Sequence, residues 1–229
     1  MQSAVTVRPD WNSIDTVLLD LDGTLLDQAY DNHIWRDLIP QRFAVLRGLD
    51  LQAAYAEIAQ RFQGRSGTLE WYDIEYWTRT LGVDVAALHR EVRSHVAWLP
   101  GAREFLQRVR AAGKRLVLLT NSHPLALAVK HDQTGVLDHL DAAASSQEFG
   151  VPKEQAQFWQ AAQARFGFDP QRSLFADDNS KMLVAARDAG IRWIYGVRHW
   201  DTKGSCREHL DHASVDGVLD LLEDGAFVL

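Results

Sequence analysis

The 229-residue sequence has little cysteine and no excess of basic residues. Its one cysteine, Cys206, cannot form a disulfide within the chain, and it cannot build a cysteine-based zinc site. The net charge of −7 offers no basic surface for nucleic acid or for an acidic membrane. An anionic small molecule would therefore need a local positive site. The sparse cysteine also favours a reducing, cytoplasmic location.

Long hydrophobic runs are missing as well. No apolar stretch approaches the length that crosses a bilayer, and residues 1–11 lack the apolar core of a signal peptide. The composition, 46% hydrophobic and 24% charged, is typical of a soluble globular protein. The length allows one substantial core and a second small domain. We therefore expect neither a nucleic acid nor a membrane partner, and the oligomeric state stays open.

Four short apolar runs predict strands buried on both faces, because their hydrophobicity is continuous rather than alternating. They lie at residues 16–19, 115–119, 173–176 and 191–197. Helical patterns between them each end at a glycine suited to a helix C-cap, and they lie at residues 102–112, 154–166 and 181–189. This alternation predicts an α/β fold, with a parallel sheet flanked by helices and ligands at the carboxyl ends of the strands.

Residues 28–98 interrupt this alternation. They contain no strand-like run, and they show four helical segments near residues 32–46, 51–62, 69–81 and 85–96. We interpret residues 28–98 as an all-helical cap domain inserted after the first core strand. Residues 1–27 and 99–229 would then form the core domain. The alternative is that these helices only cover a face of the sheet.

Two acidic residues, Asp20 and Asp22, follow the first predicted strand in the sequence Asp-Leu-Asp-Gly-Thr-Leu. Carboxylates at the end of a buried strand are unfavourable unless a cation or a proton offsets their charge, which favours a catalytic site. Asp20 can attack a phosphorus or carbon centre, and Asp22 can exchange a proton with the leaving group and with water. The alternative is a solvent-facing turn, since Asp-Gly pairs are common in turns.

A second acidic pair, Asp177 and Asp178, ends the third predicted strand. Together with Asp20 and Asp22 it would form a cluster of hard oxygen ligands. Such a cluster, without His or Cys, suits Mg²⁺ rather than zinc. The alternative is that the pair only caps the following helix.

Candidate phosphate-binding residues follow the other predicted elements. Thr120 and Asn121 end the second strand, where a hydroxyl and backbone N–H groups could hold phosphoryl oxygens or simply cap a helix. Lys153 opens a helix, where the helix dipole disfavours a cation, so it indicates function unless it is a solvated surface lysine. A phosphate dianion beside the aspartates would require Mg²⁺, Lys153 and a proton on Asp22 to offset the negative charge.

In chain order, the four motifs contain Asp20 with Asp22, Thr120, Lys153, and Asp177 with Asp178. Motifs of this kind and order resemble those of the haloacid dehalogenase superfamily of aspartate-nucleophile phosphatases. The resemblance covers nearly the whole chain, and it implies a Rossmann-like core, a Mg²⁺ cofactor and an aspartyl-phosphate intermediate. It implies these roles: Asp20 as nucleophile, Asp22 as general acid and base, Thr120 as phosphate-binding hydroxyl, Lys153 as charge-neutralising cation and Asp178 as metal-binding acid.

The metal ligands implied by this resemblance are Asp20, Asp22 and Asp178, with Asp177 as a further candidate through a water molecule. The sequence departs from the superfamily at Met182, where many members carry an acid. The full ligand set therefore stays open.

A narrower similarity joins residues 31–35, 71–77, 118–124 and 149–154 to the bacterial GMP/IMP nucleotidases. It implies dephosphorylation of purine nucleoside 5′-monophosphates with Mg²⁺. Aromatic residues of the predicted cap could stack on a purine, or they could only pack inside the helical domain. The specificity candidates are Asn32, Trp35, Tyr72, Tyr76 and Arg79, with Asp31 as a further polar candidate.

Other functions compete with this interpretation. A sugar-phosphate phosphatase or a phosphomutase of the same superfamily would keep every core residue and differ in the cap. A metal-free dehalogenase would not need Asp22 or the pair Asp177 and Asp178. A module that only binds a phosphorylated ligand would not need the complete set of nucleophile, acid, lysine and metal-binding residues. The role of the segment 198–201 is left open.

Overall fold

The computed structural model describes residues 8–209 and 211–222. Residues 1–7, which belong to the segment without signal-peptide features, lie outside the described residues. So do residue 210 and residues 223–229, which belong to the predicted core domain. None of the helices in the described part is long and apolar enough to cross a membrane.

A parallel sheet forms the centre of the described chain, with six strands in the order β3-β2-β1-β4-β5-β6. The strands are β1 (Thr16–Leu19), β2 (Arg115–Thr120), β3 (Ala142–Ser145), β4 (Ser173–Asp177), β5 (Trp193–Val197) and β6 (Ala213–Val215). The predicted α/β fold class is confirmed. The four predicted strands are β1, β2, β4 and β5, the inner four of the sheet.

The two edge strands and one strand start were not predicted. β3 has the sequence Ala-Ala-Ala-Ser and β6 has three residues, so neither forms an apolar run. The last predicted strand begins at Trp193 rather than Ile191, because the N–H of Ile191 donates to the carbonyl of Ala186 and still belongs to the end of the preceding helix.

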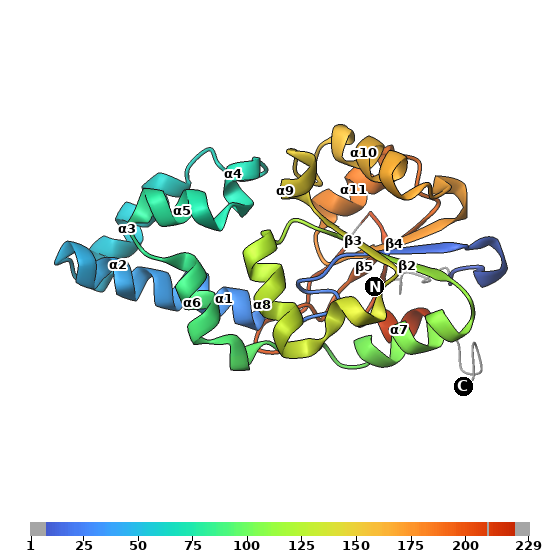
Figure 1. The fold of residues 1–229 in the computed structure, drawn as a ribbon, viewed down its shortest axis with the longest axis horizontal. Coiled ribbons are helices and arrows are strands. Elements are labelled where there is room, and N and C mark those ends of the chain that lie inside the picture. Colours follow the sequence, from blue (N-terminus) through green and yellow to red (C-terminus); the bar gives the residue numbers. More distant parts are fainter. Residues whose placement is uncertain (1–7, 210, 223–229) are drawn as a thin grey trace.

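Helices cover both faces of the sheet, with α10 and α11 above it and α7 and α8 below it in the view of Figure 1. The core helices are α7 (Ala102–Ala111), α8 (Pro124–Thr134), α9 (Ser146–Phe149), α10 (Ala156–Phe166) and α11 (Ser180–Asp188). Short 3₁₀ turns are η1 (Trp11–Ser13), η4 (Val136–His139), η5 (Pro170–Arg172) and η6 (Val218–Leu221). Successive strand residues point to opposite faces, so Leu18 and Phe158 belong to one hydrophobic cluster, and Val17 and Phe105 belong to another.

The segment from residue 28 to residue 98, here called the helical insertion, extends to one side of the sheet (Figure 1). Its elements are α1 (Ala29–His33), the π turn η2 (Ile34–Leu38), α2 (Ile39–Arg47), α3 (Leu51–Phe62), α4 (Leu69–Tyr72), α5 (Ile74–Leu81), α6 (Val85–Glu91) and η3 (Arg93–His95). The predicted helix 69–81 is split, because Asp73 accepts from the N–H groups of Glu75 and Tyr76 and so starts a new helix.

The two ends of the insertion run side by side. Leu26 forms isolated bridges to both Asp22 and Trp98, and the N–H of Asp27 donates to the carbonyl of Ala97 at 2.9 Å. The insertion therefore joins the sheet next to Asp20, at the carboxyl end of β1. Its description as a separate cap domain stays a prediction.

Candidate active site

Asp20 and Asp22 lie in a tight loop that follows β1. Two backbone N–H groups of this loop donate to the carbonyl of Leu21, at 2.9 and 2.8 Å. Gly23 has a φ of +84°, and a Cβ atom added there would lie 2.8 Å from Cγ of Asp178. A residue without a side chain is therefore needed both for the backbone conformation and for the close approach to the second acidic pair.

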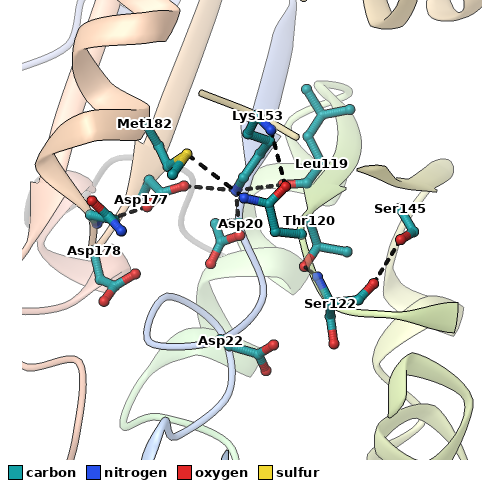
Figure 2. Close-up of polar contacts among 12 residues, drawn as sticks. Asp20, Asp22, Leu119, Thr120, Ser122, Ser145, Lys153, Asp177, Asp178 and Met182 are labelled. Atoms are coloured by element: carbon teal, nitrogen blue, oxygen red, sulfur yellow. Dashed lines mark hydrogen bonds and ion pairs between the residues drawn. The ribbon is translucent and has the colours of Figure 1, made fainter. Parts of the chain in front are cut away.

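Lys153 lies in the middle of the acidic group and is 1% exposed. Its Nζ donates to the Asp20 carboxylate, to Oδ2 of Asp177 at 2.8 Å and to the carbonyl of Leu119 at 2.9 Å (Figure 2). Burial alone would lower the pKa of Lys153, but the charges of Asp177 and Asp20 outweigh it and raise the pKa. The lysine is therefore a fixed positive charge beside the predicted nucleophile.

Three carboxylates gather around this lysine. Oxygen atoms of Asp20, Asp177 and Asp178 all lie within 4.8 Å of one another. Burial raises the pKa of Asp20 to about 7, with Lys153 opposing the rise and Asp177 adding to it, and burial likewise raises the pKa of Asp178. Buried carboxylates with too little positive charge attract a cation, and this all-oxygen donor set fits Mg²⁺.

The Asp22 carboxylate does not join that group. Its Oδ2 accepts from Nζ of Lys130 at 2.7 Å, and its Oδ1 is buried with no hydrogen-bond partner among the described residues. Figure 2 shows the Asp22 side chain apart from Asp20 and Asp177. In this arrangement one carboxylate oxygen of Asp22 is bonded to Lys130, and the other is available to accept or donate a proton. The metal-ligand role of Asp22 stays a prediction.

Asp177 belongs to the acidic group and does not cap the following helix. Its Oδ2 accepts from Lys153, while its Oδ1 accepts from the N–H of Asn179 at 2.7 Å. The N-cap of α11 is Asn179, which accepts from the N–H of Lys181 at 3.1 Å. Met182, at the position where many superfamily members carry an acid, is 2% exposed and supplies a thioether instead of a carboxylate.

Thr120 and Asn121 lie at the end of β2, beside the acidic group. Oγ1 of Thr120 accepts from the N–H of Ser122 at 2.9 Å. Oδ1 of Asn121 accepts from the N–H of Lys153 at 3.0 Å, and its Nδ2 donates to Glu154 at 3.2 Å. The Asn121 side chain therefore holds the backbone that carries the central lysine.

A cavity of about 460 Å³ opens over these residues, within the size range of small-molecule sites. Its polar side includes Asp20, Asp22, Thr120, Asn121, Lys153, Asp177 and Asp178. Residues of the helical insertion form an apolar and aromatic side: Trp35, Phe62, Trp71, Tyr72, Ile74 and Trp77. The cavity thus combines charged lining residues from the core with aromatic lining residues from the helical insertion.

The cap residues predicted to set specificity fall into two groups. Four line the cavity, namely Asn32, Trp35, Tyr72 and the further candidate Asp31. Tyr76 and Arg79 do not line it. The Tyr76 ring packs edge-on against Trp77 with ring centroids 5.0 Å apart, and Arg79 is exposed. Trp71, which was not among the candidates, lines the cavity and is partly exposed.

The segment after β5 reaches the site. Trp200 and Arg207 line the cavity, and the guanidinium carbon of Arg207 lies 3.8 Å from the Trp200 ring centroid. Arg207 also donates to the Asp178 carboxylate and, at 2.9 Å, to its carbonyl. The sequence did not reveal Arg207, because it lies in an irregular segment with no motif around it.

Two more buried polar residues were not predicted, and one of them, His89, lines the cavity. Lys130 follows Ala126 and Leu127 on the buried face of α8, and a lysine on an apolar helical stripe was a signal that could have revealed it.

Nδ1 of His89 lies 3.0 Å from the hydroxyl of Tyr30, while its Nε2 is buried with no partner in the described part of the chain. Burial lowers the pKa of His89 to about 3, so the ring is neutral near pH 7.

Comparison with known proteins agrees with this geometry. A family model described as haloacid dehalogenase-like hydrolase matches residues 14–190. The chain belongs to this family. The resemblance stated from the sequence is thereby confirmed, and the protein is an enzyme, a hydrolase.

Several known proteins are similar to most of the chain. It is 38% identical over 212 residues to the GMP/IMP nucleotidase YrfG of Escherichia coli (strain K12), covering 93% of this chain and 96% of that protein. It is 24% identical over 193 residues to the glyceraldehyde 3-phosphate phosphatase of Pyrococcus abyssi, covering 80% and 81%. The crystal structure of a HAD phosphatase from Thermococcus onnurineus shares the fold, with a TM-score of 0.76 at 19% identity, covering 91% and 96%.

Proposed function

We propose that this hydrolase is a Mg²⁺-dependent phosphatase of purine nucleoside 5′-monophosphates, GMP or IMP, that acts through an aspartyl-phosphate intermediate. Its family and its phosphatase relatives make it a phosphomonoester hydrolase. One observation carries the rest: Lys153 lies between Asp20 and Asp177 at one end of a cavity whose other end is aromatic. The helical insertion acts as a cap domain that covers this cavity.

The first half-reaction transfers the phosphoryl group to Asp20. A carboxylate oxygen of Asp20 forms a bond to phosphorus while the bond from phosphorus to the nucleoside oxygen breaks. Asp22 gives a proton to the departing oxygen through its free Oδ1. Lys153 and the end of β2, at Thr120 and Asn121, hold the phosphoryl oxygens as charge develops.

The second half-reaction releases phosphate and restores Asp20. Asp22, now without its proton, takes one from a water molecule, and that water oxygen attacks phosphorus and displaces the Asp20 carboxylate. Asp20, Asp177 and Asp178 would hold Mg²⁺. Bound Mg²⁺ neutralises negative charge on the phosphoryl group and on these carboxylates.

The aromatic side of the cavity supports a nucleotide as the substrate. Trp35 and Trp71 line the cavity and are partly exposed, so a bound molecule can contact these aromatic side chains. A purine ring is flat and apolar on both faces and can stack on such side chains. A small sugar phosphate offers no surface of that kind. The relative that is 38% identical is named for GMP and IMP, which agrees with this choice.

A phosphate-release assay with Mg²⁺ tests the proposal. The panel contains GMP, IMP, AMP, CMP, glyceraldehyde 3-phosphate and phosphoglycolate. We expect the highest kcat/KM for GMP or IMP, and a loss of at least roughly 10³-fold in Asp20→Asn. The control variant Asp132→Asn changes an exposed carboxylate on α8 and should retain full activity.

Each outcome of this assay has a separate meaning. Far better turnover of the sugar phosphates would overturn the nucleotide substrate and leave the mechanism in place. Undiminished turnover by Asp20→Asn would overturn the assigned nucleophile. Full activity in the presence of EDTA would overturn the Mg²⁺ requirement.

A further inference from the structure

We propose that Lys130 and Asp31 are positioning residues that orient the Asp22 carboxylate for proton transfer and link its orientation to the docking of the helical insertion. The inference rests on the proposed function, because it assigns Asp22 as the proton donor of that reaction. Neither residue belongs to the four superfamily motifs, and Asp31 lies in the segment 31–35 of the narrower similarity.

Lys130 is among the most buried polar side chains of the described structure, at 1% exposed. It lies on α8, one turn before the helix ends at Thr134. Its Nζ donates to Oδ2 of Asp22 at 2.7 Å, to Oδ1 of Asp31 at 3.0 Å and to Oγ of Ser122 at 3.2 Å. An ammonium group has three protons to donate, so these three acceptors satisfy it fully.

The three acceptors come from three different parts of the molecule. Asp22 lies in the loop after β1, Ser122 in the loop after β2, and Asp31 in α1, the first helix of the insertion. A buried ammonium group is stable only when it is paired. The ion pair therefore forms completely only when α1 is packed against α8. Movement of the insertion away from the core would remove Asp31 from Lys130.

The contact with Lys130 leaves Asp22 with two unlike oxygens. Oδ2 accepts from the lysine, while Oδ1 is buried and has no partner in the described residues, and Asp22 as a whole lines the cavity. A proton-transfer group must present one atom to the substrate in a fixed direction. Lys153 bonds the Asp20 carboxylate, whereas Lys130 bonds the Asp22 carboxylate.

A purely structural salt bridge would also explain these contacts, and the two roles differ in a measurable way. A nucleoside oxygen leaves only with a proton, whereas p-nitrophenolate leaves as a stable anion. Loss of Asp22 orientation should therefore slow the cleavage of a nucleotide and spare the transfer of phosphate from p-nitrophenyl phosphate to Asp20. Loss of general structural integrity should slow both to the same extent.

The experiment compares these two substrates in Lys130→Met, with Mg²⁺ present. Rapid mixing with p-nitrophenyl phosphate should give a burst of p-nitrophenolate close to one per enzyme, at a rate within about 3-fold of wild type. Steady-state turnover after the burst should be slow, because hydrolysis of the aspartyl-phosphate also needs Asp22. Cleavage of GMP should fall by roughly 10²- to 10⁴-fold, without a burst of guanosine.

The matched control is Lys114→Met. Lys114 is a partly buried lysine whose Nζ donates to the carbonyls of Trp11 and Ile14, at 2.8 and 2.7 Å. It lies before β2, away from the cavity-lining residues. This variant should change neither the burst nor the ratio of the two substrates.

Two further variants keep the test decisive if Lys130→Met does not fold. The double variant Lys130→Met, Asp31→Asn removes one buried charge of each sign, and Asp31→Asn alone keeps the contact between Lys130 and Asp22. Both variants should slow GMP cleavage more than they slow the p-nitrophenolate burst. The loss of GMP cleavage should be smaller in Asp31→Asn than in the double variant.

Two results would overturn the inference. They are unchanged GMP turnover, or a p-nitrophenolate burst that slows as much as GMP cleavage. If the wild-type protein releases phosphate from neither substrate, the proposed function itself fails, and the inference fails with it. Failure of the positioning role alone would leave wild-type turnover intact, so the two failures are distinguishable.

Discussion

Each of the two proposed reactive carboxylates has its own buried lysine. Asp20 pairs with Lys153, which also bonds Asp177, and Asp22 pairs with Lys130, which also bonds Asp31. Burial of a single unpaired charge costs several kcal/mol, so each lysine is stable only with its carboxylates. At the residue scale each reactive carboxylate therefore has its own neutralising lysine, while the charge of Asp22 still adds to the raised pKa of Asp20.

Gly23 permits the close approach of the two acidic loops, and its replacement gives a test at this scale. Gly23→Ala would place a Cβ atom 2.8 Å from Cγ of Asp178 and strain a backbone with a φ of +84°. We expect kcat/KM to fall by roughly 10²-fold, because displacement of a site residue by about 1 Å has effects of that size. Phosphate release from GMP measures it.

The matched control for Gly23→Ala is Gly113→Ala. Gly113 has a φ of +71°, and a Cβ atom there would meet nothing within 4 Å. The control should lose about 1 kcal/mol of unfolding free energy through backbone strain and retain its activity. Equal kinetic effects in both variants would contradict the role assigned to the close approach.

At the scale of elements, α4 is the part of the insertion that contacts the core on the far side of the cavity. The hydroxyl of Tyr72, at the end of α4, donates to Oε1 of Glu154 at 2.6 Å. Nε2 of Gln147, in α9, donates to the carbonyl of Leu69 at 3.3 Å. Because Glu154 follows Lys153 directly, the position of α4 is connected to the backbone of the central lysine.

A double-mutant cycle on Tyr72→Phe and Glu154→Ala measures this contact. A hydrogen bond to a charged group stabilises by about 1.5–3 kcal/mol, so we expect a coupling energy of about 1–2 kcal/mol in urea unfolding. The control pair is Tyr55→Phe with Glu154→Ala, because the Tyr55 hydroxyl donates to the carbonyl of Arg36 instead. That pair should be additive. Additivity of the first pair would show that the contact is absent in solution.

The sequence predicts the elements that local pattern determines and misses those that packing determines. The inner strands and the motif residues Asp20, Lys153 and Asp178 are visible because continuous apolar runs end in polar residues. β3 is invisible because three alanines resemble a helix as much as a strand. The partners of Lys130 are invisible too, since they come from segments 99 and 108 residues away in sequence.

At the scale of the whole molecule, negative charge is concentrated at one end of the cavity of a chain with a net charge of −7. Mg²⁺ that binds Asp20, Asp177 and Asp178 in the folded state only should therefore stabilise the fold. At a concentration about 100 times its dissociation constant it should add about 2.7 kcal/mol and raise the midpoint of thermal unfolding.

Two controls separate this stabilisation from general salt effects. NaCl at the same ionic strength should give a much smaller rise, and Asp178→Asn should lose most of the rise with Mg²⁺. An equal response of wild type and Asp178→Asn would mean that Mg²⁺ binds elsewhere.

The buried His89 makes global stability depend on pH in a predictable direction. Burial lowers the pKa of His89 to about 3, with Lys130 adding to the decrease, whereas an unfolded histidine titrates near 6.5. Between these values the unfolded chain binds a proton that the folded protein excludes, so stability falls as the pH decreases. Lowering the pH from about 7.5 to about 5 should cost about 2 kcal/mol through this residue.

The variant His89→Gln removes this titration. Other groups also titrate, so the free energy of urea unfolding is measured at both pH values for each protein. The change between the two pH values is then compared between wild type and variant. His89→Gln should lose about 2 kcal/mol less than wild type on acidification. His95→Gln, at an exposed position, should behave as wild type. An identical pH response of wild type and His89→Gln would mean that His89 accepts a proton in the folded state, which its burial beside Tyr30 and Lys130 opposes.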